Sequence, residues 1–139
     1  MPVALTDEMK DLVENAVANG MPCVLVTVLP DGYPNPSFRG SLMVFDSGHL
    51  AYWDRSLRGA MASYESGNQK VAVLHRDPKS RKSWRFYGTV ELHKEGELRE
   101  KVMARTPQNE LDADPERKGV AVLIRVDRVV ERGQTIMER

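Results

Sequence analysis

The chain has 139 residues, about the length of one domain. Hydrophobic residues make up 41% of it and charged residues 29%, which excludes an intrinsically disordered chain. Twenty basic residues balance twenty acidic residues, so no overall field attracts nucleic acid or an anionic membrane surface.

The first part of the chain predicts one helix followed by short strands that are joined by hairpin turns. Apolar residues recur at helical spacing after Thr6, which is a suitable N-cap, and Gly20 marks the end of that pattern. The pattern then changes to Val-rich runs separated by turn residues. In chain order, we expect a helix over about residues 6–19 and strands over about residues 23–29, 33–45 and 49–54.

The rest of the chain alternates between helices and strands. Apolar residues lie on one helical face between Ser56 and Ser66, and apolar and polar residues alternate between Trp84 and His93. In chain order, we expect a helix over about residues 56–66, a strand over 70–75, a basic loop over 76–83, a strand over 84–93, a helix over 97–105, a polar segment over 108–118, a strand over 119–130 and a loose polar tail from residue 131.

These elements predict an all-β fold with peripheral helices. Most of the connections between strands are too short for the crossovers that a parallel sheet requires. Closure into a barrel also removes exposed strand edges. We therefore expect a six-stranded antiparallel β-barrel over about residues 22–130, with the whole chain, residues 1–139, forming a single domain.

The segment Asp-Arg-Ser-Leu-Arg-Gly, residues 54–59, comes where a strand ends and a helix begins. Free backbone N–H groups at a helix start, together with Ser56 and Arg58, suit a phosphate monoester. The alternative is a solvated helix start that is capped by Asp54 or Ser56, and this alternative is favoured when the segment is taken alone.

A second polar segment lies on the predicted strand over residues 33–45. Strand alternation places Ser37, Arg39 and Ser41 on one face, and Gly40 allows a ligand to approach the backbone closely. The alternative is an ordinary water-facing row of an antiparallel sheet, which is again favoured when the segment is taken alone.

The basic loop and the strand that follows it, residues 76–85, combine Arg and Lys with Trp84. This composition suits contact with single-stranded nucleic acid, which small barrels of the OB type bind. The neutral chain and its 6% aromatic content favour a solvated hairpin instead, so nucleic acid is an unlikely partner.

The remaining residue types predict no metal site and no membrane span. Cys23 is the single cysteine, which forbids an intrachain disulfide, fits a cytoplasmic protein and predicts a small core residue. The three histidines have no metal-ligand spacing, and no phosphate-binding loop of the Walker or Rossmann type occurs. The apolar runs are too short to cross a membrane, and the first residues do not resemble a secretory signal.

The order of these segments resembles the pyridoxamine 5′-phosphate oxidase-like family of FMN-binding split barrels. The motifs that carry the resemblance lie between residues 22 and 93: Pro-Asp-Gly-Tyr-Pro, Ser-Phe-Arg-Gly-Ser, Leu-Ala-Tyr-Trp-Asp, Arg-Ser-Leu-Arg, Lys-Val-Ala-Val-Leu and Trp-Arg-Phe-Tyr-Gly. The resemblance implies a Greek-key split barrel that forms a homodimer, with FMN in a cleft to which both subunits contribute.

The resemblance also implies which residues bind the cofactor. It assigns the FMN phosphate and ribityl chain to the predicted strand over residues 33–45 and to the start of the predicted helix over residues 56–66. It assigns the end of the strand over residues 49–54 to the flavin. A further strand approaches from the partner subunit. The implied cofactor-binding residues are Ser37, Arg39, Gly40, Ser41, Tyr52, Trp53, Asp54, Ser56, Arg58, Lys82, Ser83, Trp84 and Arg85.

Two departures from the vitamin B6 oxidases of this family argue against oxidation of pyridoxamine phosphate. No Trp follows Gly119, and Ser37 stands where the resemblance implies an Arg. We therefore expect an FMN-dependent oxidoreductase or flavin reductase that uses a small-molecule electron donor or acceptor, and we name no catalytic residue. The alternatives are deazaflavin (F420) or haem as cofactor, a non-catalytic flavin- or haem-binding or sensing protein, and a single-stranded nucleic-acid binder.

Overall fold

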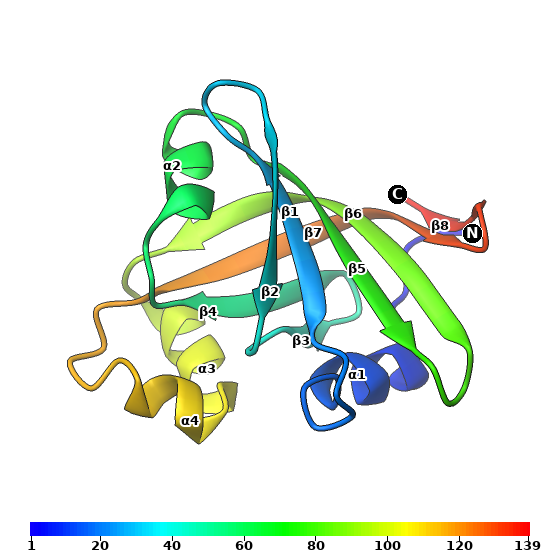
Figure 1. The fold of residues 1–139 in the computed structure, drawn as a ribbon, viewed down its shortest axis with the longest axis horizontal. Helices are drawn as coiled ribbons and strands as arrows, with labels where there is room; N and C mark the ends of the chain where they lie inside the picture. The colour runs from blue at the N-terminus through cyan, green and yellow to red at the C-terminus, as the bar shows by residue number, and fades with distance from the viewer.

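The computed structural model describes residues 1–139 and shows one strongly curled antiparallel sheet with short helices around its rim (Figure 1). The hydrogen-bonded order of the strands is β2-β1-β5-β6-β7-β4-β3, and β8 pairs with β7 beside this path. The strands are β1 (Cys23–Val28), β2 (Pro34–Arg39), β3 (Met43–Asp46), β4 (His49–Asp54), β5 (Lys70–Asp77), β6 (Lys82–His93), β7 (Val120–Glu131) and β8 (Gln134–Glu138).

The sheet is a barrel with a split between its two end strands. Strands β2 and β3 are the ends of the hydrogen-bonded path, and only residues 40–42 separate them in the chain. They do not pair with each other, because each has its only partner on the other side: β1 for β2, and β4 for β3. The predicted antiparallel split barrel flanked by helices is thereby confirmed.

The number of strands differs from the prediction at two places. The single strand expected over residues 33–45 is two strands, because the chain leaves β1 after Arg39 and joins β4 at Met43. Between them, the buried Ser41 side chain bonds to the backbone of Trp53, so the segment is held by a hydroxyl rather than by a strand ladder.

The polar tail is also ordered, which corrects the expectation of a loose end. Residues after Arg132 turn at Gly133, where φ is +76°, and return along β7 as β8. Met137 is buried against the barrel, and the Arg139 guanidinium donates hydrogen bonds to the Val126 carbonyl at 3.0 and 3.2 Å. Together the break in the second strand and the extra β8 make eight strands instead of six.

The helices are short and lie at the ends and edges of the barrel. They are α1 (Asp7–Glu14), α2 (Gly59–Glu65), α3 (Glu97–Arg105) and α4 (Gln108–Asp112). Thr6 caps α1 as predicted, with its hydroxyl accepting the Met9 N–H at 3.1 Å, but the helix ends five residues before the predicted position 19. None of the four helices has the length and apolar character that are needed to span a membrane.

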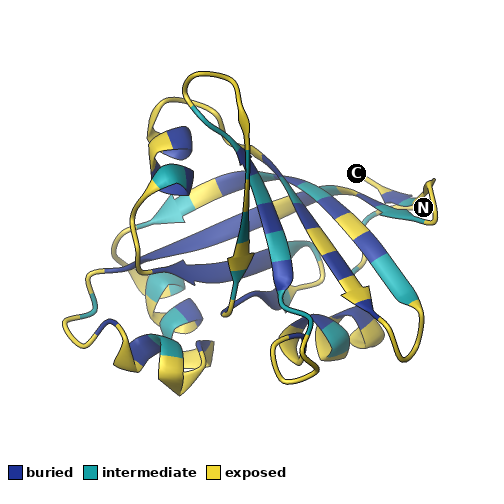
Figure 2. Ribbon diagram, in the orientation of Figure 1, coloured by how far each residue is buried: buried dark blue, intermediate teal, exposed yellow.

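The core fills the barrel and extends beneath α3 and α4. Figure 2 shows β4 and β7 buried along most of their length, because the barrel interior covers one face and the helices cover the other. Tyr52 and Trp53 therefore point in opposite directions, Tyr52 into the barrel and Trp53 toward α3. This second layer brings α4 close to the end of β4, where the split lies.

Candidate functional site

Two polar segments that lie apart in the sequence meet at the split of the barrel. Because Ser41 bonds to the backbone of Trp53 at 3.0 and 3.3 Å, the end of β2 is held against the end of β4. A hollow of about 260 Å³ lies at this junction, and we call it the split hollow. Its lining consists of Ser37, Phe38, Arg39, Gly40, Ser41, Trp53, Arg55, Ser56 and Glu110.

Arg39 is the less exposed of the two cations that line the split hollow. Its Nε donates to the Ser37 hydroxyl at 3.3 Å, and its guanidinium carbon lies 5.0 Å from the centre of the Tyr52 ring. Its Nη1 lies 3.7 Å from Oδ2 of Asp54, and the Arg39 side chain is only 15% exposed. These contacts fix the guanidinium before any ligand binds, which lowers the conformational entropy that binding would cost.

Asp54 lies next to the split hollow, beside Arg39, and its side chain is fully buried. Its Oδ1 accepts the Leu57 N–H at 3.0 Å and the Ser56 hydroxyl at 3.4 Å, whereas Oδ2 has no hydrogen-bond partner. Arg39 is therefore the main compensation for the buried negative charge. The same contacts shape the turn in which Leu57 adopts a φ of +54°, a left-handed conformation that costs energy for a residue other than glycine.

Tyr52 lies inside the barrel rather than in the split hollow. Its hydroxyl is 2.7 Å from that of Tyr64 on α2, and both rings are buried. Burial raises the pKa of Tyr64 to about 12 and that of Tyr52 well above its ordinary value. Both hydroxyls therefore stay protonated at neutral pH, and the pair joins β4 to α2.

Trp53 lines the split hollow from the outer side of β4. Its Nε1 donates to Oδ2 of Asp114 at 3.0 Å, and the Arg99 guanidinium lies 4.9 Å from its ring centre. These contacts fix the indole between the split hollow and the loop that precedes β7.

Comparison with known proteins identifies the family of this chain. The sequence model of the family described as pyridoxamine 5′-phosphate oxidase matches residues 5–132. The chain belongs to the pyridoxamine 5′-phosphate oxidase family. The match extends well beyond the motifs between residues 22 and 93 that carry the resemblance in the sequence. None of the curated proteins compared with this chain matches it.

Solved structures with the fold of this pyridoxamine 5′-phosphate oxidase family member span nearly the whole chain. A candidate pyridoxamine 5′-phosphate oxidase from Lactobacillus delbrueckii is 28% identical, with a TM-score of 0.72 over 91% of this chain and 93% of that one. HupZ from Group A Streptococcus is 23% identical, with a TM-score of 0.69 over 97% and 98%. An FMN-binding protein from Syntrophomonas wolfei is 15% identical, with a TM-score of 0.67 over 91% and 88%.

Proteins with other cofactors share this family's fold. An F420 reductase is 21% identical to this chain, with a TM-score of 0.67 over 91% of this chain and 98% of that one. A haem-binding protein from Mycobacterium smegmatis is 14% identical, with a TM-score of 0.63, and this chain spans 56% of its length. The structural neighbours thus include FMN-binding, F420 and haem-binding proteins.

In this family member, the two residues predicted at the FMN phosphate lie on different sides of the segment 54–58. Ser56 lines the split hollow, whereas Arg58 lines a larger cavity of about 500 Å³ between α2, the start of α3 and residues 117–120. Arg58 is the residue before α2 and makes no side-chain cap, and α2 begins at Gly59 rather than at the predicted residue 56. The turn held by Asp54 delays the helix start.

The four predicted residues of β6 lie away from the split hollow of their own chain. Trp84 is buried in the barrel, where it stacks on His75 at 5.4 Å. Lys82 and Ser83 line a small hollow at the far end of β6, and Arg85 points outward from the sheet. In the prediction these residues reach the flavin from a partner subunit, and that assignment stays a prediction.

Glu110 is the site residue that sequence reasoning missed. Its Oε2 accepts the Arg55 Nε at 3.0 Å, and its Oε1 lies against Gly40 so closely that a Cβ at that position would collide with it. A carboxylate therefore occupies part of a hollow that is otherwise basic. No motif pointed to Glu110, because its position depends on how α4 packs beneath β4.

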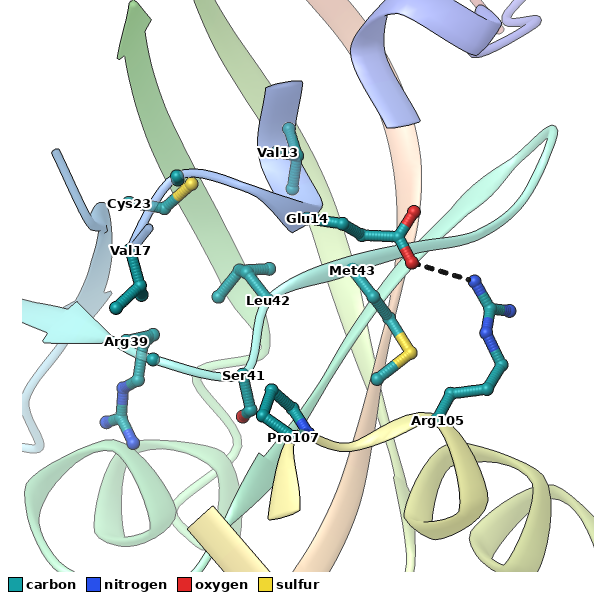
Figure 3. A pocket seen from close by; sticks show the side chains of 12 residues that line it. Val13, Glu14, Val17, Cys23, Arg39, Ser41, Leu42, Met43, Arg105 and Pro107 are labelled. Carbon is teal, nitrogen blue, oxygen red and sulfur yellow. Dashed lines mark hydrogen bonds and ion pairs between the residues drawn. The ribbon is translucent and has the colours of Figure 1, made fainter. Parts of the chain in front are cut away.

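A second hollow, of about 220 Å³, lies on the other side of the β2–β3 connection. Figure 3 shows Arg39 and Ser41 at one edge of it and an ion pair between Glu14 and Arg105, 3.3 Å long, at the other. Burial raises the pKa of the Cys23 thiol in this hollow to about 12, so the thiol stays protonated and unreactive. Cys23 is therefore a core residue, in agreement with the prediction.

Proposed function

We propose that this chain is a cytoplasmic flavoprotein that binds FMN at the interface of a homodimer. We further propose that it acts as an FMN-dependent oxidoreductase of the flavin reductase type, with a small-molecule electron donor or acceptor. The observation that carries the proposal is the split hollow, in which a fixed guanidinium and several hydroxyl groups come together at the junction of β2 and β4.

The residues of the split hollow fit the phosphate end of FMN. Arg39 and Arg55 supply guanidinium donors, which form strong charge-assisted hydrogen bonds with phosphate oxygens. Ser37 and Ser56 add hydroxyl groups, and Gly40 leaves room that a side chain would fill. Arg58, which the resemblance also assigns to the phosphate, lies on the other side of the segment 54–58. Bound flavin supplies the redox chemistry, while the chain positions it and excludes competing reactions.

The size of the split hollow supports a site that is completed by a second subunit. Small-molecule sites usually enclose about 300–1,000 Å³, and the split hollow encloses about 260 Å³. A ligand as large as FMN therefore needs a further wall. A partner chain supplies that wall in the homodimer that we propose.

The outer face of the sheet beside the split hollow supports the place of that partner. Phe38, Val24 and Leu74 form one cross-strand row on β2, β1 and β5, and Arg85 of β6 continues it. Phe38 is 75% exposed and Leu74 38% exposed, which is unusual for adjacent large apolar residues. Phe38 also lines the split hollow, so a partner seated on this row lies at the edge of the ligand site.

The donor groups of the split hollow favour a flavin over haem. Haem iron takes an imidazole, thiolate, thioether or phenolate ligand, whereas the split hollow offers guanidinium, hydroxyl, carboxylate and indole groups. His75, the one buried histidine, is stacked on Trp84 inside the barrel. Deazaflavin has phosphate and ring features in common with FMN and is the second candidate, in line with the F420 reductase of this fold.

The experiment that tests the proposal is identification of the bound chromophore. The protein is purified, its visible spectrum is recorded, and the molecule that is released on denaturation is identified by mass spectrometry. We expect a flavin spectrum and the mass of FMN. A released deazaflavin or haem, or a colourless protein that does not bind added FMN, would contradict the assignment.

A further inference from the structure

We propose that the second hollow, of about 220 Å³, binds a small carboxylic acid that has an apolar body. This hollow, called the α1 hollow below, lies between the end of α1, the β2–β3 connection and the end of α3 (Figure 3). The inference goes beyond the proposed function and does not depend on FMN, because the cation that would recognise the acid, Arg105, does not line the split hollow.

One side of the α1 hollow is apolar and fixed by packing. The end of α1 and the turn after it contribute Val13, Ala16 and Val17, and the segment that leads into β3 contributes Leu42 and Met43. All of these except Val17 are buried in the core. Because core side chains are close-packed, this wall is in place before a ligand arrives. It provides a surface for the apolar body of a ligand.

Arg105, at the end of α3, places a fixed positive charge at one edge of the α1 hollow. Its Nη2 donates to the Val44 carbonyl at 2.8 Å and its Nη1 to the Phe45 carbonyl at 2.9 Å, and its guanidinium carbon lies 5.5 Å from the Phe45 ring centre. These neutral carbonyl groups orient the guanidinium but do not cancel its charge. A guanidinium held in this way presents the planar group of donors that matches a carboxylate.

Glu14 is a weakly held partner of this guanidinium, and a ligand can replace it. Its Oε1 lies 3.3 Å from Nη2 of Arg105, and the two side chains are 29% and 33% exposed. Ion pairs that remain open to water contribute little to stability. Glu14 is also the last residue of α1, where the helix dipole disfavours a negative charge, and the last turn contains no basic residue.

Replacing Glu14 at Arg105 would leave the core intact. The contact between Glu14 and Arg105 is the one hydrogen bond that joins α1 to α3, and Figure 3 shows it at the edge of the hollow rather than among the apolar side chains. Arg105 keeps its two carbonyl partners when Glu14 moves away. A carboxylate that enters the hollow can therefore take the place of the Glu14 carboxylate.

The charge and the size of the α1 hollow indicate the class of ligand. Arg39, the other cation of the lining, is paired with the buried Asp54 at 3.7 Å. Only Arg105 then faces a ligand without a buried acid beside it, which suits one carboxylate better than a doubly charged phosphate. An apolar cavity of about 150 Å³ holds a benzene molecule, so a hollow of about 220 Å³ suits a one-ring aromatic or short branched carboxylic acid.

The test is isothermal titration calorimetry of the full chain with benzoate, and with benzamide as an uncharged probe of the same shape. Glu14→Gln removes the carboxylate that competes for Arg105. Glu8→Gln is the matched control, because Glu8 also lies on α1 and pairs with a cation, Lys82 at 3.8 Å, but does not line the hollow. Arg105→Gln removes the recognising group, and circular dichroism checks that this variant is folded.

We expect benzoate to bind with a Kd near about 1 mM and benzamide to bind at least about tenfold more weakly. Glu14→Gln should bind benzoate about three- to fivefold more tightly, Glu8→Gln should differ from the wild type by less than about twofold, and Arg105→Gln should bind about tenfold more weakly. Because misfolding does not produce a gain in affinity, the Glu14→Gln result is decisive even if Arg105→Gln fails to fold.

Four results would each overturn the proposal. They are no saturable binding of benzoate up to about 20 mM, equal affinity for benzoate and benzamide, the same affinity for benzoate in Glu14→Gln and Glu8→Gln, and loss of benzoate binding when FMN is added. The last result would make the α1 hollow a part of the flavin site. Because the other titrations need no FMN, failure of the FMN assignment leaves them intact.

Discussion

The split hollow and the larger cavity beside Arg58, called the basic cavity here, lie on opposite sides of the segment 54–58 and differ in how they are built. The split hollow is small, opens beside an exposed apolar row, and has a cation that is tied to the buried Asp54. The basic cavity is about twice as large and is lined by cations that carbonyl groups hold or that exposed glutamates pair only loosely. In the homodimer proposed above, the partner chain completes the first, whereas the second is lined by residues of one chain.

The two regions also differ in how far the fold prepares the binding groups before a ligand arrives. At the split hollow, the fold has already buried a carboxylate and ordered Arg39, so a phosphate meets a prepared donor. At the basic cavity, the attraction is mainly the field of several cations, and salt screens exposed charges strongly. Binding at the split hollow should thus depend on particular residues and on the dimer, and the attraction of an anion to the basic cavity on its local cations and on the salt concentration.

The largest expected effect comes from a charge placed on the apolar row. Leu74→Asp buries a carboxylate in the proposed interface, at a cost of about 3 kcal/mol, or about a hundredfold in affinity. We expect a monomeric protein that loses FMN but keeps the circular dichroism spectrum of the wild type. Sedimentation, titration with FMN and circular dichroism provide the measurement.

Tyr33→Asp is the control for this variant, because Tyr33 is also a large exposed residue but lies outside the row and does not line the split hollow or the hollow beside it. If Leu74→Asp stays dimeric and keeps FMN, the row is not the interface. A changed circular dichroism spectrum would mean that the variant is misfolded.

Arg39→Ala is expected to weaken FMN binding about ten- to a hundredfold, since a charge-assisted hydrogen bond contributes roughly 1.5–3 kcal/mol. It also leaves the buried Asp54 without its cation, which should lower the free energy of unfolding by about 3 kcal/mol. Urea denaturation and fluorescence titration with FMN measure the two effects.

The double variant Arg39→Ala/Asp54→Asn separates these roles. Asparagine removes the uncompensated charge and keeps an oxygen for the Leu57 N–H, so stability should partly return. FMN affinity should not return with it. Recovery of both would show that Arg39 acts only through folding.

Arg58→Ala is expected to have a smaller effect, about three- to tenfold on FMN, because Arg58 flanks the split hollow without lining it. Riboflavin lacks the phosphate and should be nearly indifferent to the change. An equal loss for FMN and riboflavin would place Arg58 at the ring or in the fold, rather than at the phosphate.

The smallest expected effect is a gain. Glu110→Gln removes the one carboxylate from the lining of the split hollow and frees Arg55, so FMN should bind about two- to fivefold more tightly. Glu116→Gln, which changes the same charge outside that hollow, should leave FMN affinity unchanged. Weaker binding in Glu110→Gln would mean that Glu110 contacts the flavin directly.

Most strands of the barrel could be predicted because the residue patterns that indicate them lie within short stretches of the sequence. Hairpin turns and alternating burial are encoded within a few residues, as in β1, where every second side chain points inward. Strand β8 was missed because its sequence has only two large apolar residues, and its order comes from pairing with β7. The break between β2 and β3 was missed because it depends on the bond from Ser41 to a distant strand.

The candidate site was predictable only in part, for a similar reason. The segments around Arg39 and Ser56 are short polar segments at the ends of strands. Their order along the chain resembles that of a known family, so both could be selected as candidate cofactor-binding segments. That they line one hollow depends on the tertiary structure and could not be predicted from the sequence. Glu110 and the basic cavity were not predicted, because cations from separate segments gather there only once α3 and the loop before β7 are in place.

The most direct test of the shared flavin site is sedimentation velocity of the FMN-loaded wild-type protein, followed at the protein and flavin absorbances together. The chain has a mass of 15.7 kDa. We predict that the flavin absorbance sediments with a species of twice that mass, and that dilution to the monomer releases the flavin. Flavin that sediments with a 15.7 kDa monomer would contradict the account.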